Sequence, residues 1–283
     1  EGIPEENSLR VTDCPVELSG ERFRKGAPLR PETELASEVA RAAGARLRES
    51  FERPIDVETK NGRELVTEMD RASEEIILSG IRHEFPGDRT IAEESSPGSE
   101  EANRVWIIDP LDGTNNYAHG YPFFSIAIAL EEGGVPAVAV VYDPLREELF
   151  SAESGEGAKL NGRKVRVSDT GSLTDSIVTT GFPYDRTAMS DNNLANLNRF
   201  ILSARGIRRG GSAELDLVYV ACGRLDGFWE LGLKTWDVAA GGLIVREAGG
   251  RVTNFEGRGW DHRLGDVVAS NGLIHDEMLS LIG

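Results

Sequence analysis

The stretch VWIIDPLDGT, residues 105–114, joins an apolar strand signal to two carboxylates. Its apolar residues run into Asp109 and Asp112, and Pro110 between them fixes φ and stiffens the bend. Gly113 allows a tight turn, and we expect a helix to begin near Thr114, where free N–H groups and the helix dipole would favour a bound phosphate. The pattern predicts a strand that brings two acidic side chains to the edge of a sheet, where they could bridge two cations.

Two other segments have the same character. TIAEES, residues 90–95, runs into Glu93, and TWDVAA, residues 235–240, places Asp237 before a helix. Side chains at the ends of buried strands collect at the edge of a sheet, and carboxylates gathered there repel one another unless cations neutralise them. Hard divalent ions such as Mg²⁺ meet this need. Two metals beside a phosphate cradle suit phosphoryl transfer to water.

Apolar periodicity predicts alternating helices and strands, which indicates layered α/β structure. We expect helices at 31–50, at 70–84 with Asp70 as the N-cap, and at 189–204, 213–222, 238–248 and 273–282. Strands are expected at 55–57, 65–67, 90–92, 105–108, 123–130, 137–142, 148–151, 176–180, 206–208, 227–230, around Val252 and at 267–269.

Three regions follow from this organisation. Residues 1–30 form a polar arm that we expect to be flexible. Residues 31–168 form an N-terminal α+β half that carries most of the predicted metal ligands. Residues 169–283 form a C-terminal α/β half that carries Asp237 and the substrate contacts.

Composition excludes several classes of function. A net charge of −17 argues against a nucleic-acid substrate and against anionic membranes, since both need a basic surface. Two cysteines, Cys14 and Cys222, make neither a disulfide framework nor a zinc cluster and suit a reducing cytoplasm. No apolar run approaches the roughly 20 residues that cross a bilayer, and no signal segment is recognisable. We expect a cytoplasmic protein that acts on a small molecule.

Four segments resemble the signatures of the inositol monophosphatase family, a group of magnesium-dependent, lithium-sensitive phosphatases. These are LVTEMD (65–70), AEES (92–95), DPLDGTNN (109–116) and WDVAAG (236–241). The order and spacing are similar to those of the family, with Ala92 in place of the usual glycine. The resemblance covers roughly residues 33 to 283 and is closest to the bacterial type. It implies the five-layer αβαβα sandwich of the sugar phosphatases and a homodimer.

The resemblance also implies a metal site of two to three Mg²⁺ ions. Glu93, Asp109 and the Leu111 carbonyl would hold the first ion. Asp109, Asp112 and Asp237 would hold the second, and a third, weaker ion would lie near Glu93. Inhibition by Li⁺ is implied in the same way.

The remaining implied roles concern water and substrate. Asp70 and Thr114 would form a dyad that orients and deprotonates the attacking water, with Glu93 also serving catalysis. Lys60 lies where the family has a mobile loop beside the metals. Substrate contacts are implied for Asp112, Gly113, Thr114, Ser212, Ala213 and Glu230.

Two rival classes of protein fit the residues less well. A haloacid dehalogenase-type phosphatase needs an aspartyl nucleophile at position 110, which is Pro110. A non-catalytic regulatory module that binds metal or sugar phosphate would be expected to lack a ligand, whereas the set here is intact. The resemblance therefore implies an inositol-1-monophosphatase, with fructose-1,6-bisphosphatase or histidinol-phosphatase of the same superfamily as the alternative. Glu230 favours a polyol, because a carboxylate accepts hydrogen bonds from hydroxyls.

Overall fold

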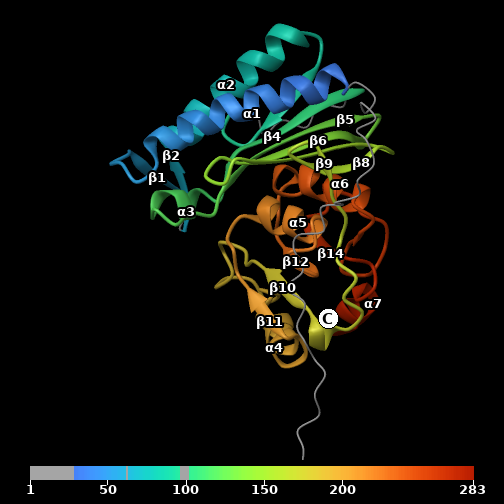
Figure 1. The fold of residues 1–283 in the computed structure, drawn as a ribbon. Helices are drawn as coiled ribbons and strands as arrows, with labels where there is room; N and C mark the ends of the chain where they lie inside the picture. The colour runs from blue at the N-terminus through green and yellow to red at the C-terminus, as the bar shows by residue number, and fades with distance from the viewer. Residues whose placement is uncertain (1–28, 62, 96–101) are drawn as a thin grey trace, which may run out of the picture.

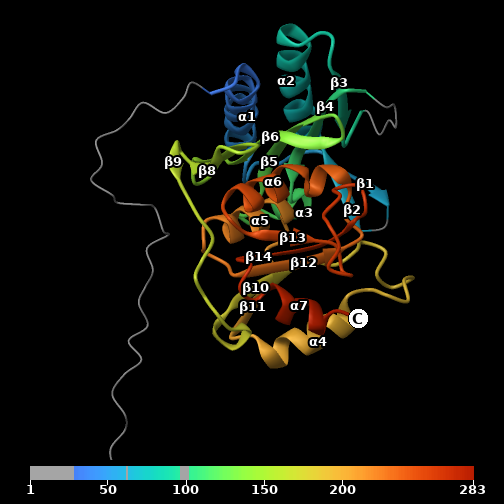
Figure 2. The ribbon, with the colours of Figure 1, turned by 90° about the vertical axis from the view of Figure 1, so that its right-hand side faces the viewer.

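Five layers of helices and sheets stack in the order helix, sheet, helix, sheet, helix (Figures 1 and 2). The computed structural model describes residues 29–61, 63–95 and 102–283. The expected flexible arm, residues 1–30, lies outside this part of the chain except for its last two residues. The predicted αβαβα architecture is confirmed.

The first outer layer consists of α1 (Pro31–Ser50) and α2 (Glu68–Glu84), joined through the hairpin of β1 (Val57–Asn61) and β2 (Glu64–Thr67). The predicted bounds of the first helix are confirmed, since Pro31 opens it.

The N-cap predicted for the second helix is wrong. Thr67 caps α2, and Asp70 occupies the third helical position, where its Oδ2 accepts hydrogen bonds from the backbone N–H (2.7 Å) and hydroxyl (2.6 Å) of Thr67. A capping box satisfies the first N–H groups of the helix better than Asp70 alone could. It also fixes the direction in which Asp70 points.

A seven-stranded sheet forms the second layer in the order β3-β4-β5-β6-β7-β8-β9. β3 and β4 are parallel, and all other neighbours are antiparallel. The strands are β3 (Arg89–Ala92), β4 (Arg104–Asp112), β5 (Ser125–Glu132), β6 (Val135–Asp143), β7 (Glu148–Glu153), β8 (Gly157–Leu160) and β9 (Arg163–Lys164). The last two were not predicted, because they are short and carry no run of apolar residues.

The predicted bend at Pro110 takes a different form. β4 continues through Pro110 to Asp112, with a register shift against β5 between Asp109 and Asp112. Such a bulge re-aims side chains at the end of a strand. The two carboxylates are therefore positioned by a strand irregularity and not by a separate turn.

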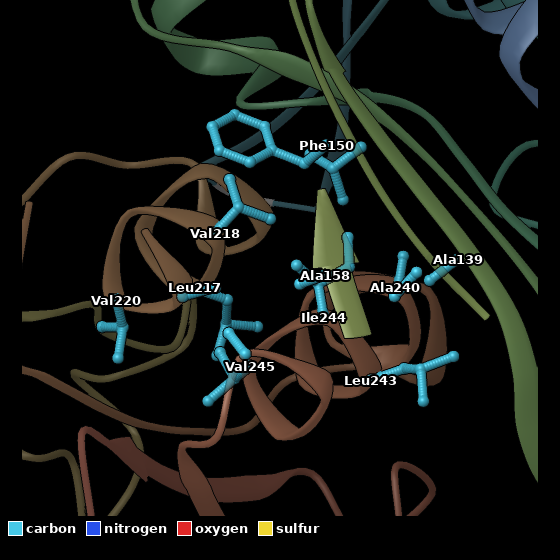
Figure 3. Packing of buried hydrophobic residues seen from close by; sticks show 14 of the residues in the cluster. Ala139, Phe150, Ala158, Leu217, Val218, Val220, Ala240, Leu243, Ile244 and Val245 are labelled. Atoms are coloured by element: carbon cyan, nitrogen blue, oxygen red, sulfur yellow. The ribbon is translucent and has the colours of Figure 1, made fainter. Parts of the chain in front are cut away.

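The middle layer contains α5 (Ala213–Ala221) and α6 (Ala239–Glu247), which pack between the two sheets. Figure 3 shows Val218 of α5 beside Phe150 of β7, and Ile244 of α6 beside Ala158 of β8, within the same hydrophobic core. The short helix α3 (Thr114–Ala118) follows β4, as predicted. Because α5 lies between the two sheets and has no face toward solvent, it is apolar around most of its circumference.

A five-stranded sheet and two outer helices complete the sandwich. The strand order of this sheet is β11-β10-β12-β14-β13. The strands are β10 (Ile177–Thr180), β11 (Gly206–Arg208), β12 (Gly227–Leu231), β13 (Arg251–Thr253) and β14 (Asp266–Ser270). Outside it lie α4 (Leu194–Ser203) and α7 (His275–Leu281), which cover a core that includes Phe200, Trp229 and Met278. α4 begins later than predicted, because Asn193 adopts a left-handed conformation with φ of 68°.

No helix in the described part of the chain is both long and apolar enough to span a bilayer.

Candidate active site

The end of β4 provides the centre of the site. Asp109 is 2% exposed, and its Oδ1 accepts a hydrogen bond of 3.0 Å from the backbone N–H of Leu111. The Ser73 hydroxyl on α2 donates to the Pro110 carbonyl at 2.6 Å and ties the bulge to the first helical layer. The backbone around Asp109 is thus held from two sides, which fixes the direction of its side chain.

Gly113 is required where the strand turns into α3. It has φ of 95°, and a Cβ at this position would lie 3.1 Å from the Phe123 carbonyl and 3.2 Å from the Gly211 carbonyl. Only glycine combines this backbone conformation with such close neighbours. The turn presents the first N–H groups of α3, which have no partner within the helix.

Thr114 and Asp70, which the resemblance implies as a dyad, are hydrogen-bonded to each other. The Thr114 hydroxyl lies 2.9 Å from Asp70 Oδ1 and 3.0 Å from the Leu111 carbonyl, so its single proton has two acceptors. Asp70 is fully buried, and burial raises its pKa even though the hydrogen bonds from Thr67 and Thr114 oppose the shift. A carboxylate with a raised pKa accepts a proton more readily than an ordinary one.

Asp112 is bound to the start of α5. Its Oδ1 accepts from the N–H of Ala213 (3.0 Å), and its Oδ2 accepts from the N–H of Glu214 (2.9 Å) and the hydroxyl of Ser125 (3.0 Å). The Ser212 hydroxyl donates to the same Oδ2. These donors lower the pKa of Asp112, but burial outweighs them and the net shift is upward. Asp112 thereby joins the first sheet to the middle helical layer.

Glu93 is held by a basic residue of the β1 strand. Lys60 Nζ lies 3.0 Å from Glu93 Oε1 and also forms an ion pair with Glu94. The resemblance placed Lys60 in a mobile loop, and the structure places it in β1. Burial raises the pKa of Glu93, Lys60 opposes the shift, and Asp237 adds to it, with a net value of about 8.

Asp237 ends a short 3₁₀ helix, Thr235–Asp237, directly before α6. Its Oδ2 accepts a hydrogen bond of 2.6 Å from the Lys234 N–H. Burial and the charge of Asp112 raise the pKa of Asp237 to about 7, against that hydrogen bond. Asp237 is the only predicted metal ligand that comes from the second half of the chain.

The described part of the chain does not contain three acidic, histidine or cysteine side chains already gathered as a ligand shell. Each carboxylate is instead held by an internal donor: Lys60 for Glu93, the α5 N–H groups for Asp112, and Lys234 N–H for Asp237. The charges of Glu93, Asp112 and Asp237 nevertheless act together on Asp109, whose pKa burial and these neighbours raise well above its usual range. Buried oxygen donors that repel one another fit hard divalent cations.

One cavity of about 160 Å³ collects most of the predicted residues. Its lining includes Glu93, Asp109, Leu111, Asp112, Gly113, Thr114, Ser212, Ala213, Glu230 and Asp237. Asp70 does not line it and lies behind Thr114.

Residues that were not among the predicted site residues also reach this cavity. Arg209, Lys234, Tyr184 and Asp216 line it. Asp216 is 3% exposed, and burial raises its pKa to about 8 against a hydrogen bond from Thr179. The available signal was a pair of acidic residues, Glu214 and Asp216, inside the otherwise apolar stretch 213–221.

Comparison with known proteins gives a consistent result. The model of the inositol monophosphatase family matches residues 29–282. An inositol-1-monophosphatase of Synechocystis is 46% identical over 248 residues, covering 87% of this chain and 86% of that protein. The Nus factor SuhB of Pasteurella multocida is 44% identical over 257 residues, covering 90% and 96%.

A solved structure agrees in three dimensions. The inositol monophosphatase from Anabaena superposes with a TM-score of 0.81 at 43% identity, covering 88% of this chain and 94% of that one. The protein therefore belongs to the inositol monophosphatase family of phosphoric monoester hydrolases.

Proposed function

We propose that the protein hydrolyses inositol 1-phosphate to inositol and phosphate with Mg²⁺ as cofactor and water as the attacking group. The observation that carries this proposal is the hydrogen-bonded pair of Thr114 and Asp70 at the wall of a cavity lined by buried carboxylates. Membership of a family of phosphomonoesterases indicates the class of reaction. The pair of Thr114 and Asp70 offers a path for the proton that the attacking water loses.

The carboxylates fit the cofactor. Glu93, Asp109 and the Leu111 carbonyl would hold one ion, and Asp109, Asp112 and Asp237 the other. Bound Mg²⁺ would offset the negative charge of the phosphate and make a coordinated water easier to deprotonate.

The residues of the chain account for the proton and the phosphate. With its own proton donated to Asp70, the Thr114 oxygen can accept a hydrogen bond from the attacking water, and Asp70 can take up the proton that the water loses. The first N–H groups of α3, at Gly113 and Thr114, would donate to the phosphate oxygens. The α5 N–H groups of Ala213 and Glu214 are already occupied by Asp112, so the phosphate is expected to bind at α3.

Glu230 supports a polyol as the leaving group. It is 9% exposed and lines the same cavity as Ser212 and Ala213. Burial raises the pKa of Glu230 well above its usual range, and the charge of Arg209 opposes this shift. A buried carboxyl at a cavity wall is suited to hydrogen bonds with sugar hydroxyls.

Arg209 and Lys234 keep a bisphosphate alternative open. Both line the cavity, so a second phosphate would meet positive charge there. A phosphate-release panel with inositol 1-phosphate, fructose 1,6-bisphosphate, histidinol phosphate and adenosine 3′,5′-bisphosphate, each with Mg²⁺ and with EDTA, tests the proposal. Inositol 1-phosphate should give the highest kcat/KM, and activity with EDTA equal to that with Mg²⁺ would refute the cofactor.

A regulatory role is the second candidate, and it is favoured by the similarity to the Nus factor SuhB. A purely regulatory protein would bind the phosphoesters of the panel without releasing phosphate. A homodimer, a cytoplasmic location and inhibition by Li⁺ are further parts of the proposal. Analytical ultracentrifugation and a Li⁺ titration of phosphate release test the first and the last of these.

A further inference from the structure

Glu214 is a buried acidic residue on α5 that has no role in the reaction outlined above. It has no exposed surface, and no basic side chain is among the groups that shift its pKa most strongly. Its carboxylate accepts hydrogen bonds from two N–H groups at the start of α6, those of Ala240 (3.3 Å) and Gly241 (2.5 Å). A helix N-terminus is a favourable partner for a carboxylate, so Glu214 caps α6 from the neighbouring helix.

Gly241 is matched to this contact. A Cβ at position 241 would lie 2.6 Å from Glu214 Oε2 and 2.6 Å from Leu217 Cβ. Any larger residue would push α5 and α6 apart and break the cap. Figure 3 shows Leu217 and Ala240, from the two helices, in the same layer.

The backbone of Glu214 makes a second connection. Its N–H donates to Asp112 Oδ2 at 2.9 Å, beside the N–H of Ala213. One residue thus holds Asp112 with its main chain and the start of α6 with its side chain. α6 begins two residues after Asp237, so the cap also restrains the segment that carries Asp237.

We propose that Glu214 is a positioning residue that sets the separation of Asp112 and Asp237, and thereby the affinity of the cation that these two carboxylates share. The inference rests on the proposed function, because it assumes that both side chains hold a metal. Metal-site geometry tolerates shifts of only about 0.5 Å. Loss of the cap frees the start of α6, because the N–H groups of Ala240 and Gly241 then lose the partner that holds them against α5.

Mn²⁺ binding followed by electron paramagnetic resonance tests this inference without relying on turnover. The wild type should bind at least two Mn²⁺ ions. Glu214→Ala should weaken one of them about tenfold and leave the other within about twofold, as expected for a group that orients a ligand. Glu214→Gln keeps an acceptor oxygen and should recover part of the affinity.

Leu217→Ala provides the matched control. It removes packing between α5 and α6 at the same place and leaves both hydrogen bonds of Glu214 intact. It should lower the Tm and leave both Mn²⁺ affinities unchanged. In an Asp237→Asn background, Glu214→Ala should have no further effect on Mn²⁺ binding, because coupled residues are not additive.

The outcomes separate the two claims. If Glu214→Ala lowers both affinities equally, or no more than Leu217→Ala does, Glu214 is only structural and the inference is wrong. If the wild type binds no Mn²⁺, the proposed cofactor is wrong and the inference is overturned with it.

Discussion

Mg²⁺ should stabilise the protein more strongly at about pH 9 than at about pH 7. The reason is the proton held by Glu93, whose pKa burial and Asp237 raise to about 8 against the effect of Lys60. A carboxyl whose folded-state pKa is raised stabilises the metal-free fold below its unfolded pKa, and this contribution is lost as the pH rises through the folded value. A cation ligand must be deprotonated, so Mg²⁺ binds more tightly once Glu93 has lost its proton. This binding restores the stability that the metal-free protein loses at high pH.

The size of the effect follows from the pKa of Glu93. With a folded-state value of about 8, one proton is released across this pH range, which corresponds to about 1.4 kcal/mol. For a chain of this size, each kcal/mol shifts the Tm by about 2–4 °C. The difference between the Tm values with Mg²⁺ and with EDTA should therefore grow by about 3–6 °C.

Thermal unfolding at both pH values, with Mg²⁺ and with EDTA, measures this difference. Taking the difference removes the contribution of titrating groups that lie far from the metal site. In Glu93→Gln the pH dependence of the difference should become smaller, since the cation then displaces no proton from residue 93 and only those on Asp109 and Asp237 remain. A difference that stays constant or shrinks in the wild type would contradict the shared role of Glu93 in proton and cation binding.

Three further substitutions test single contacts. Asp109→Asn should reduce phosphate release by about 100-fold or more and weaken Mg²⁺ binding measured by calorimetry. Near-normal turnover would show that Asp109 is not a metal ligand. Lys60→Met should raise cation affinity about fivefold, because the partly buried ion pair of about 1 kcal/mol between Lys60 and Glu93 no longer competes with the cation for Glu93. Unchanged affinity would show that Lys60 does not oppose cation binding. Glu230→Gln should lower kcat/KM for inositol 1-phosphate about tenfold relative to a simple aryl phosphate, and an equal loss for both would refute a hydroxyl contact.

Much of the candidate site could be predicted from short segments of the sequence. Asp109, Asp112 and Asp237 each follow or end a segment whose local pattern fixes its conformation: an apolar strand, a proline and glycine, or a helix start. Local rules of this kind depend on few neighbours, so α1 was predicted with its observed bounds.

Features that depend on contacts between distant segments could not be predicted. Asp70 was expected to cap its helix, but Thr67 is the cap. The contact of Asp70 with Thr114, 44 residues away, was implied by the family resemblance and by no local pattern. The ion pair of Lys60 with Glu93 spans 33 residues, and the contact of Glu214 with Gly241 spans 27. Sequence periodicity contains no information about which helix will receive the carboxylate of Glu214.

The internal donors of the site suggest that its two proposed cation positions differ in how readily they form. Asp112 is held by backbone N–H groups and Asp237 by the Lys234 N–H, and a folded backbone can move little. Glu93 is held by the long side chain of Lys60, which can rotate away. Asp112 and Asp237 are therefore held in fixed directions before a cation arrives, whereas Glu93 becomes free to bind one only when Lys60 leaves. A cation titration should accordingly show two steps, and Lys60→Met should strengthen only the step that involves Glu93.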